Sequence, residues 1–288
     1  MPEATRGVAL SVPCPPPAVP AVVRRFAAGR PVRAVWVNQL GGVTFRVDAG
    51  RSGAEFVKVA DADVADFAAE AERLRWAARY ITVPQMLGWG VDGGCAWLRT
   101  GALSGRSAVD PRWLAAPEIA VRAIGAGLRV LHDRMPVNSC PFDWSVGGRL
   151  AKLTPPARAS LGQAPPVDRP VVCHGDACAP NTLIDDDGRC CGHVDLGGLG
   201  VADRWADLAV ATLSLGWNYP GRWEEVFFAA YGAEPDPQRI DYYRPAVDGR
   251  RCGLALSSGA DKPSTVGTPP MSPERYQCRS RASATPDS

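Results

Sequence analysis

The most informative segment of this 288-residue chain is 174–181, which has the sequence HGDACAPN. It follows the short apolar run 171–173, which is typical of a buried strand. It precedes two apolar segments separated by Asp185–Gly188, a strong signal for a hairpin turn. The sequence Asp-Leu-Gly follows that hairpin at 195–197. We therefore expect a polar loop and a hairpin that bring two carboxylates and an amide together.

These three side chains match what phosphoryl transfer from ATP requires. One carboxylate must accept the proton of the substrate hydroxyl, and hard oxygen ligands must hold Mg²⁺ against the phosphates. Asp176 is the candidate base, and Asn181 and Asp195 are the candidate magnesium ligands. The interval from Asp176 to Asn181 equals the Asp-to-Asn interval of the kinase catalytic loop. A plain polar turn is the alternative, and the accompanying Asp-Leu-Gly sequence argues against it.

A lysine upstream is a candidate partner for the phosphates of ATP. Lys58 lies in the apolar segment Phe56–Ala60 and is one of only three lysines among 32 Lys and Arg residues. We expect Glu70, on the following helix, to orient it. Two alternatives stay open: Lys58 could be a strand residue that faces water, and Glu72 competes with Glu70 from another face of the helix.

Two neighbouring glycines complete the set of candidates for nucleotide binding. Gly41 and Gly42 lie in a turn between the first two expected strands, where they could cover the phosphates. As a motif they are weak, because the sequence is not GxGxxG and glycines are common in ordinary hairpins.

Hydrophobic periodicity gives the expected elements. Short alternating runs over 32–59 predict three antiparallel strands, and 95–98 predicts another. Helical spacing predicts a helix over 63–80, with Asp61 or Asp63 as its cap. Further helices are expected over 203–215, over 223–231 and over 117–134, the last with four apolar residues on one face. These four are Ile119, Ile124, Leu128 and Leu131.

This order of elements predicts an α+β fold with two lobes. The expected parts are a β-rich nucleotide-binding lobe over 1–100 and a mainly helical catalytic and acceptor-binding lobe over 101–243. Residues 244–288 are rich in Pro, Gly, Ser and Arg and lack hydrophobic periodicity. Such a composition cannot offset the entropy of ordering, so we expect a disordered tail there.

The segment Val172–Ala209 resembles the aminoglycoside phosphotransferases, in HGDxxxPN, in HVDLG and in GVADRWADLA. Leu131-His132 followed by SCPF at 139–142 is similar to a second signature of that family. The resemblance extends over 33–243 and is strongest to the streptomycin 3″-phosphotransferases. It implies a protein-kinase-like fold, binding of ATP and Mg²⁺, and transfer of the γ-phosphate to a hydroxyl of a small aminoglycoside antibiotic, which would confer resistance.

The chain departs from the family's pattern at two places. Gly198 stands after Asp-Leu-Gly, where family members commonly carry Arg, so one cationic contact is missing or supplied elsewhere. After Tyr243 the segment 244–248 breaks the pattern, whereas the family continues with an apolar helix and an acidic terminus that helps to hold the drug. A reading-frame change near codon 244 is our hypothesis for this difference.

Several functions remain open within this interpretation. Asp195 is followed almost at once by the expected helix at 203, which leaves no room for the peptide-binding platform of protein kinases. A small hydroxylated acceptor is therefore expected, and a polycationic drug would need carboxylates beyond those on magnesium. Asp207 is expected to brace the catalytic loop rather than to bind the drug. The alternatives are a 3′-phosphotransferase of kanamycin or neomycin, another small-molecule kinase, and an inactive MgATP-binding protein.

Composition bounds the remaining classes of function. The net charge of +2 gives no strong field for nucleic acid or an anionic membrane, and no apolar run is long enough to span a bilayer. The first residues lack the pattern of a secretory signal, so we expect a cytoplasmic protein, and a monomer. The nine cysteines include no CxxC pair, which disfavours a zinc site.

Overall fold

The computed structural model describes residues 16–38, 41–50, 53–150 and 163–244. The tail predicted over 244–288, with the reading-frame hypothesis attached to it, lies outside these residues except for Arg244. Contacts divide the described chain into two compact units. The β-rich unit comprises 16–71 and 85–102, and the helical unit comprises 72–84 and 103–244.

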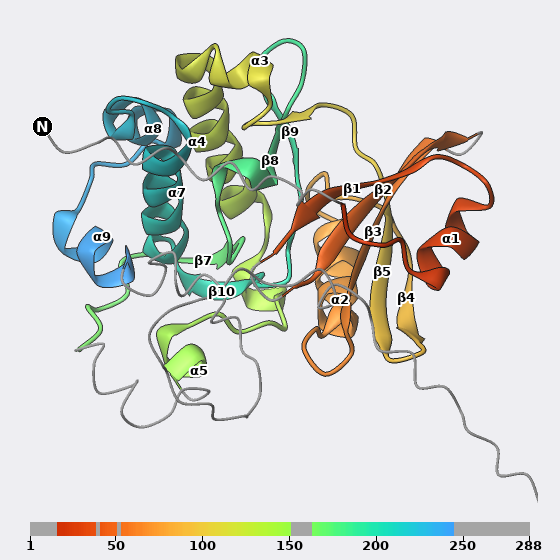
Figure 1. The fold of residues 1–288 in the computed structure, drawn as a ribbon. Coiled ribbons are helices and arrows are strands. Elements are labelled where there is room, and N and C mark those ends of the chain that lie inside the picture. The colour runs from red at the N-terminus through yellow and green to blue at the C-terminus, as the bar shows by residue number, and fades with distance from the viewer. Residues whose placement is uncertain (1–15, 39–40, 51–52, 151–162, 245–288) are drawn as a thin grey trace, which may run out of the picture. The chain divides into compact units, whose positions relative to one another are not determined.

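The β-rich unit contains a five-stranded antiparallel sheet with the strand order β1-β2-β3-β5-β4 (Figure 1). The three strands expected over 32–59 are therefore confirmed, and β4 is one that the periodicity did not predict. The strands are β1 (Val32–Val37), β2 (Val43–Gly50), β3 (Gly53–Asp61), β4 (Met86–Asp92) and β5 (Cys95–Gly101).

The side chains of strand β3 alternate between the two faces of this sheet. Val57 and Val59 are buried in a cluster with residues of helix α1 (Ala21–Ala27). Because successive side chains of a strand point to opposite faces, Lys58 lies on the other face. Its register neighbours are Thr44 on β2 and Leu98 on β5.

Helix α2 spans Phe67–Ala77 and begins later than expected. The Asp66 carboxylate accepts a hydrogen bond from the Ala69 amide at 3.0 Å and so caps the helix. The prediction that Asp61 or Asp63 would cap it was wrong. The amides of residues 64 and 65 both bond the Asp61 carbonyl, which makes a separate turn before the helix.

The helical unit is built around helix α4, which covers Pro117–Arg134 as predicted. Of its four expected core residues, Ile124, Leu128 and Leu131 are buried, but Ile119 is 48% exposed and was wrongly included. Ile119 lies in the first turn of the helix. The other α-helices that the structure describes in this unit are α3 (Pro111–Leu114), α5 (Val146–Leu150), α7 (Trp205–Asn218), α8 (Glu224–Tyr231) and α9 (Pro237–Tyr243).

Two small sheets complete this unit. Strand β7 (Pro170–Cys173) pairs with β10 (Gly200–Asp203), and β8 (Thr182–Ile184) pairs with β6 (Arg106–Ser107) and β9 (Cys190–His193). Asp203 therefore ends a strand, and the prediction that a helix begins there was wrong. The pairing with β7 holds 200–203 extended, and α7 starts at Trp205.

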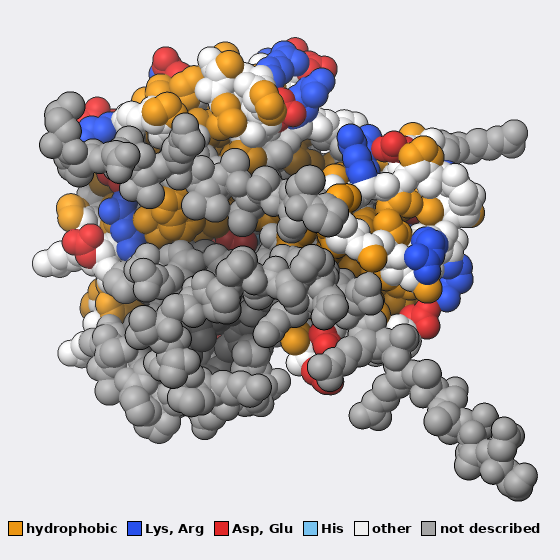
Figure 2. Space-filling model, viewed as in Figure 1, with side chains coloured by type: hydrophobic (Ala, Val, Ile, Leu, Met, Phe, Trp, Pro, Cys, Tyr) orange, Lys and Arg blue, Asp and Glu red, His pale blue; other side chains and the backbone are white. Residues whose placement is uncertain are grey.

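The expected α+β class, with a β-rich part followed by a mainly helical part, is confirmed. On the face drawn in Figure 2, cationic and anionic side chains of the described residues lie in small adjoining groups. Within the described part of the chain, no helix has both the length and the apolar character needed to cross a bilayer.

Candidate active site

The predicted catalytic loop, residues 174–181, follows β7 directly, and we call it the HGD loop. In the pairing of β7 with β10, Cys173 lies opposite Gly200. This register brings the DLG segment, residues 195–197, and Gly198 to the start of the HGD loop. At Gly175 the backbone is left-handed (φ 84°), and a Cβ there would lie 2.1 Å from the Gly198 carbonyl oxygen. Only glycine fits this crossing.

Asp176 and Asn181 are in direct contact within the HGD loop. The loop ends in a short 3₁₀ turn (Ala179–Asn181), closed by the Asn181 amide bonding the Cys178 carbonyl at 3.0 Å. From this turn the side-chain nitrogen of Asn181 donates to the Asp176 carbonyl at 3.0 Å and to its carboxylate at 3.1 Å. The amide oxygen of Asn181 is then the atom that a cation could take.

Asp195 lies at the far end of the hairpin, with a left-handed backbone (φ 64°). The Val194 amide bonds the Asn181 carbonyl at 3.0 Å, so the two ends of the hairpin meet. The pKa of Asp176 lies above its usual value because burial disfavours the carboxylate and because the Asp195 carboxylate is nearby. The Asp195 carboxylate and the Asn181 amide oxygen are hard oxygen ligands of the kind that suits Mg²⁺, and Asp176 lies beside them.

Asp207, on the first turn of α7, braces the HGD loop from inside the unit, as predicted. Its carboxylate accepts the His174 amide at 2.5 Å and the Gly175 amide at 3.0 Å. His132 of α4 bonds the same carboxylate through Nε2 at 3.0 Å, and its Nδ1 lies 2.8 Å from the Tyr231 hydroxyl. Because an ionised carboxylate only accepts hydrogen bonds, Nε2 of His132 carries a proton.

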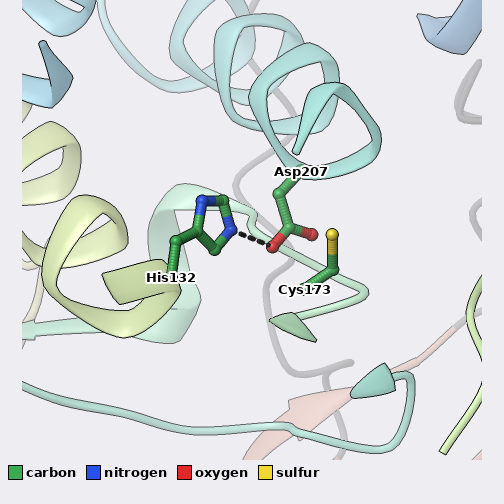
Figure 3. Close-up of side chains that lie close together, drawn as sticks. All are labelled: His132, Cys173 and Asp207. Carbon is green, nitrogen blue, oxygen red and sulfur yellow. Dashed lines mark hydrogen bonds and ion pairs between the residues drawn. The ribbon is translucent and has the colours of Figure 1, made fainter. Parts of the chain in front are cut away.

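The pKa of Asp207 lies below its usual value although the side chain is fully buried. Burial alone would raise it, but the hydrogen bond from His132 and the donors from the loop outweigh this effect. Figure 3 shows His132 and Asp207 in contact, with the Cys173 sulfur beside them. Burial raises the pKa of the Cys173 thiol well above its usual value. The hydrogen bonds of His132 and Asp207 make this cluster a brace for the HGD loop.

A second contact from α7 holds the other end of the HGD loop. The Ser214 hydroxyl accepts the Ala179 amide at 2.9 Å, and both residues are buried. Sequence reasoning missed Ser214. The available signal was that Thr212 and Ser214 place hydroxyls in an apolar segment of α7, because buried polar groups are nearly always paired.

There is little room for a side chain at Gly198. A Cβ there would lie 3.1 Å from both the Gly175 carbonyl oxygen and the ring of Trp144. The Arg149 guanidinium lies over that same ring, 5.0 Å from its centroid. The ring of Trp144, which precedes α5, and the guanidinium of Arg149 on α5 therefore lie around the position where the family commonly carries Arg.

In the β-rich unit, Lys58 pairs with Glu70. The Lys58 nitrogen lies 2.6 Å from a Glu70 carboxylate oxygen, with the two side chains 25% and 9% exposed. The predicted pairing is confirmed, and the competing Glu72 is exposed on the helix. An ammonium group held in this way is preorganised to meet an anion.

Gly41 and Gly42 form the expected turn between β1 and β2. Gly41 has a left-handed backbone (φ 82°), and its amide bonds the Asn38 carbonyl at 3.1 Å. The Asn38 side chain accepts the Gly42 amide at 2.8 Å. The turn is therefore tied down by Asn38.

The structure thus brings the candidate residues together in two groups. Asp176, Asn181 and Asp195 meet in the helical unit, and Lys58 pairs with Glu70 in the β-rich unit. Gly41 and Gly42 belong to the β-rich unit as well, in the turn described above.

Two pockets in the helical unit differ in charge. One of about 400 Å³ is lined by Arg122, Arg134 and Arg189, and no acidic residue is among its described lining residues. The other, of about 260 Å³, is lined by Asp143 and Asp203, and the Asp203 carboxylate is buried and ion-paired with Arg239 at 3.0 Å. Of these two pockets, only the second has acidic residues among its described lining residues.

Comparison with known proteins gives a consistent family. The model of the phosphotransferase enzyme family (APH) matches residues 39–243. The chain is 32% identical to the streptomycin 3″-kinase of Streptomyces griseus over 251 residues, which are 71% of this chain and 91% of that protein. It is also 32% identical to an aminoglycoside 3′-phosphotransferase of Streptomyces fradiae, over 62% of this chain and 78% of that protein.

Solved structures agree with this assignment. The aminoglycoside phosphotransferase APH(3″)-Id of Streptomyces rimosus superimposes with a TM-score of 0.62 at 29% identity, over 77% of this chain and 93% of that chain. A second structure of that enzyme, in complex with ADP and streptomycin, superimposes with a TM-score of 0.55 at 28% identity, over 72% of this chain and 91% of that chain. The fold is therefore protein-kinase-like, and the chain is an enzyme that belongs to the phosphotransferase enzyme family, among the aminoglycoside phosphotransferases.

Proposed function

We propose that the protein uses ATP and Mg²⁺ to phosphorylate a hydroxyl of an aminoglycoside, with the 3″-hydroxyl of streptomycin as the first candidate. The observation that carries this proposal is the contact of Asn181 with Asp176 beside Asp195. It is the arrangement that a metal-assisted kinase reaction needs. The similarity to a streptomycin 3″-kinase and to a structure with bound ADP and streptomycin supports the choice of substrates.

Each candidate residue then has a role in the reaction. The acceptor hydroxyl oxygen forms a bond to the γ-phosphorus as the bond from that phosphorus to ADP breaks, and Asp176 takes the hydroxyl proton on a carboxylate oxygen. Asn181 and Asp195 would hold Mg²⁺, which neutralises charge on the phosphates. Lys58, oriented by Glu70, would bind phosphate oxygens, and the turn at Gly41 and Gly42 would cover them.

The raised pKa of Asp176 in the isolated protein is compatible with this role. Its first cause is burial and its second is the Asp195 carboxylate. A bound dication would attract both carboxylates and favour the ionised form of Asp176 that can accept a proton. The base would therefore reach its working state when the substrate complex is complete.

A cationic acceptor needs anionic surroundings, and the exposed Asp143 lines one of the two pockets. The pocket lined by Asp143 and Asp203 adjoins the segment that contacts Gly198, since Trp144 follows Asp143 directly. The arginine-lined pocket would repel a polycation. We therefore propose that the acceptor binds on the Asp143 side of the HGD loop.

Kanamycin and neomycin are the second candidate acceptors. The support for them is that the 3′-phosphotransferase of Streptomyces fradiae has the same 32% identity as the streptomycin kinase. An inactive MgATP-binding protein is the third possibility, and it follows from the altered segment after Tyr243.

The test is acceptor-dependent ADP release by the purified protein with streptomycin, kanamycin, neomycin or no acceptor, together with the mass of the product. We expect turnover with streptomycin and a loss of about 100- to 10,000-fold in Asp176→Asn. Asp187→Asn, the same change on an exposed hairpin turn, is the matched control and should be unaffected. Turnover with kanamycin or neomycin alone would move the assignment to the 3′ class. Nucleotide binding without turnover on any acceptor would favour the inactive protein.

A further inference from the structure

The two contacts between α7 and the HGD loop come from one face of the helix. Asp207 and Ser214 are seven residues apart, about two turns, so their side chains lie one above the other. Asp207 holds the amides at 174 and 175, before Asp176, and Ser214 holds the Ala179 amide, after it. The helix therefore fixes the loop on both sides of the candidate base.

Ser214 is itself held in place. The Asn218 side-chain nitrogen, one turn further along α7, donates to the Ser214 carbonyl at 2.8 Å and to its hydroxyl oxygen at 3.2 Å. The hydroxyl oxygen thus accepts two hydrogen bonds, one from the loop and one from Asn218. With both donors present, the orientation of this buried side chain is fixed.

The hydrogen bond at Ala179 holds the turn that carries Asn181, the candidate metal ligand. Ala179 is the first residue of the 3₁₀ turn, and Asn181 is the last. The orientation of that turn sets where the Asn181 amide points, and its nitrogen is already committed to Asp176. If the Ala179 amide lost its partner, a buried donor would be left without a hydrogen bond and the turn would shift to find one.

We propose that Ser214, supported by Asn218, is a positioning residue that aims Asn181 at the metal of the phosphoryl-transfer reaction. The inference rests on the function proposed above, because it assigns Asn181 to the metal. Ser214 touches no reacting atom and acts through the turn. Its loss should therefore weaken metal binding in a protein that is still folded.

The matched control is Thr212, which lies on the same helix and is equally buried. Its hydroxyl donates to the Ala209 carbonyl of its own helix at 3.0 Å and accepts a hydrogen bond from Arg244 at 3.4 Å, and neither partner is in the HGD loop. Thr212→Val therefore removes a buried hydroxyl without changing a contact to the HGD loop. Ser214→Ala removes one that the loop needs.

The first measurement is amide hydrogen exchange of the metal-free protein, in peptides that cover the HGD loop. Ser214→Ala should speed exchange at the Ala179 amide about five- to tenfold, and Thr212→Val should not. Unchanged exchange in Ser214→Ala would overturn the proposal. If Ser214→Ala does not fold, Asn218→Ala takes its place, with the same direction expected and the same outcome against it.

The second measurement is Mn²⁺ binding with ADP, followed by electron paramagnetic resonance. Ser214→Ala should weaken Mn²⁺ about tenfold, as loss of residues that orient metal ligands does. In an Asn181→Ala background the same change should have little further effect. An equal loss in both backgrounds, or faster exchange with unchanged Mn²⁺ affinity, would overturn the positioning role.

These readouts separate this inference from the proposed function. If the wild-type protein binds Mn²⁺ with ADP but phosphorylates no aminoglycoside, the proposed acceptor is wrong and the exchange and Mn²⁺ results still decide the role of Ser214. If the wild-type protein binds no Mn²⁺ with ADP, both proposals fail.

Discussion

Replacing Gly175 with alanine would test how closely the HGD loop must pack against the segment that follows Asp195. Gly175 has φ 84°, and its added Cβ would lie 2.1 Å from the Gly198 carbonyl oxygen, where ordinary contact begins near 3.4 Å. The overlap is therefore about 1.3 Å (3.4 − 2.1), and it involves backbone on both sides. Neither segment can yield by turning a side chain, so the HGD loop and the DLG segment must separate.

The expected cost has two parts that a control can separate. A left-handed backbone costs alanine about 1–2 kcal/mol, and overpacking adds about 1–3 kcal/mol, so Gly175→Ala should lower the free energy of unfolding by about 2–5 kcal/mol. Gly232 has φ 80°, but its nearest neighbour would be the flexible Arg129 side chain at 3.4 Å. Gly232→Ala should therefore cost only about 1–2 kcal/mol.

The assay compares urea unfolding and phosphotransfer in the two variants. A shift of about 1 Å between catalytic groups lowers rates about 100-fold, so Gly175→Ala should lose activity even where it is fully folded. Gly232→Ala should keep wild-type turnover. Equal destabilisation of the two variants, with activity retained in both, would refute the close packing of Gly175 against Gly198.

Three further predictions concern residues in both units. Lys58→Met should raise the KM for ATP and lower turnover by at least about tenfold in the folded protein, and an unchanged KM would contradict a phosphate-binding role. His132→Phe should lower the free energy of unfolding by about 2 kcal/mol, because the buried Asp207 carboxylate loses a charged hydrogen bond; urea titration would measure it, and no change would disprove the brace. Glu55 of β3 is buried, and hydrogen bonds from Arg99 of β5 hold its pKa below the usual 4.5 although burial opposes them. The ionised Glu55 therefore stabilises the folded protein. This contribution is fully present above the usual pKa and is lost as the pH falls through the folded-state pKa. Unfolding of Glu55→Gln should accordingly be less pH-dependent than wild type in that acidic range, and identical pH profiles would contradict the linkage.

The parts of the site that the sequence predicted are those set by local geometry. The Asp176-to-Asn181 contact depends on a five-residue interval and one short turn, so it follows from spacing. Lys58 meets Glu70 because alternation in a strand and helical periodicity each fix a face. In both cases the information lies within a few residues of the side chain.

The errors occurred where a distant partner determines the local structure. Asp203 was predicted to begin the helix that follows it, and the pairing of 200–203 with β7 makes it the end of a strand instead. Asp66 caps α2 in place of Asp61 because a separate turn absorbs the residues between them. Ile119 fits the helical period, but its exposure depends on which turn of α4 is covered by other helices.

The pattern of α7 shows how more of the site could have been predicted. The helix is buried over most of its length, so each polar side chain on it must find a partner within the unit. Asp207, Ser214 and Asn218 recur at intervals of seven and four, which places them on one face, whereas Thr212 lies off that face. Of these four, Asp207 and Ser214 bond the HGD loop, Asn218 bonds Ser214, and Thr212 bonds its own helix and Arg244. A polar stripe on a buried helix therefore predicts which segment of the fold must be held rigid, and here that segment carries the candidate base.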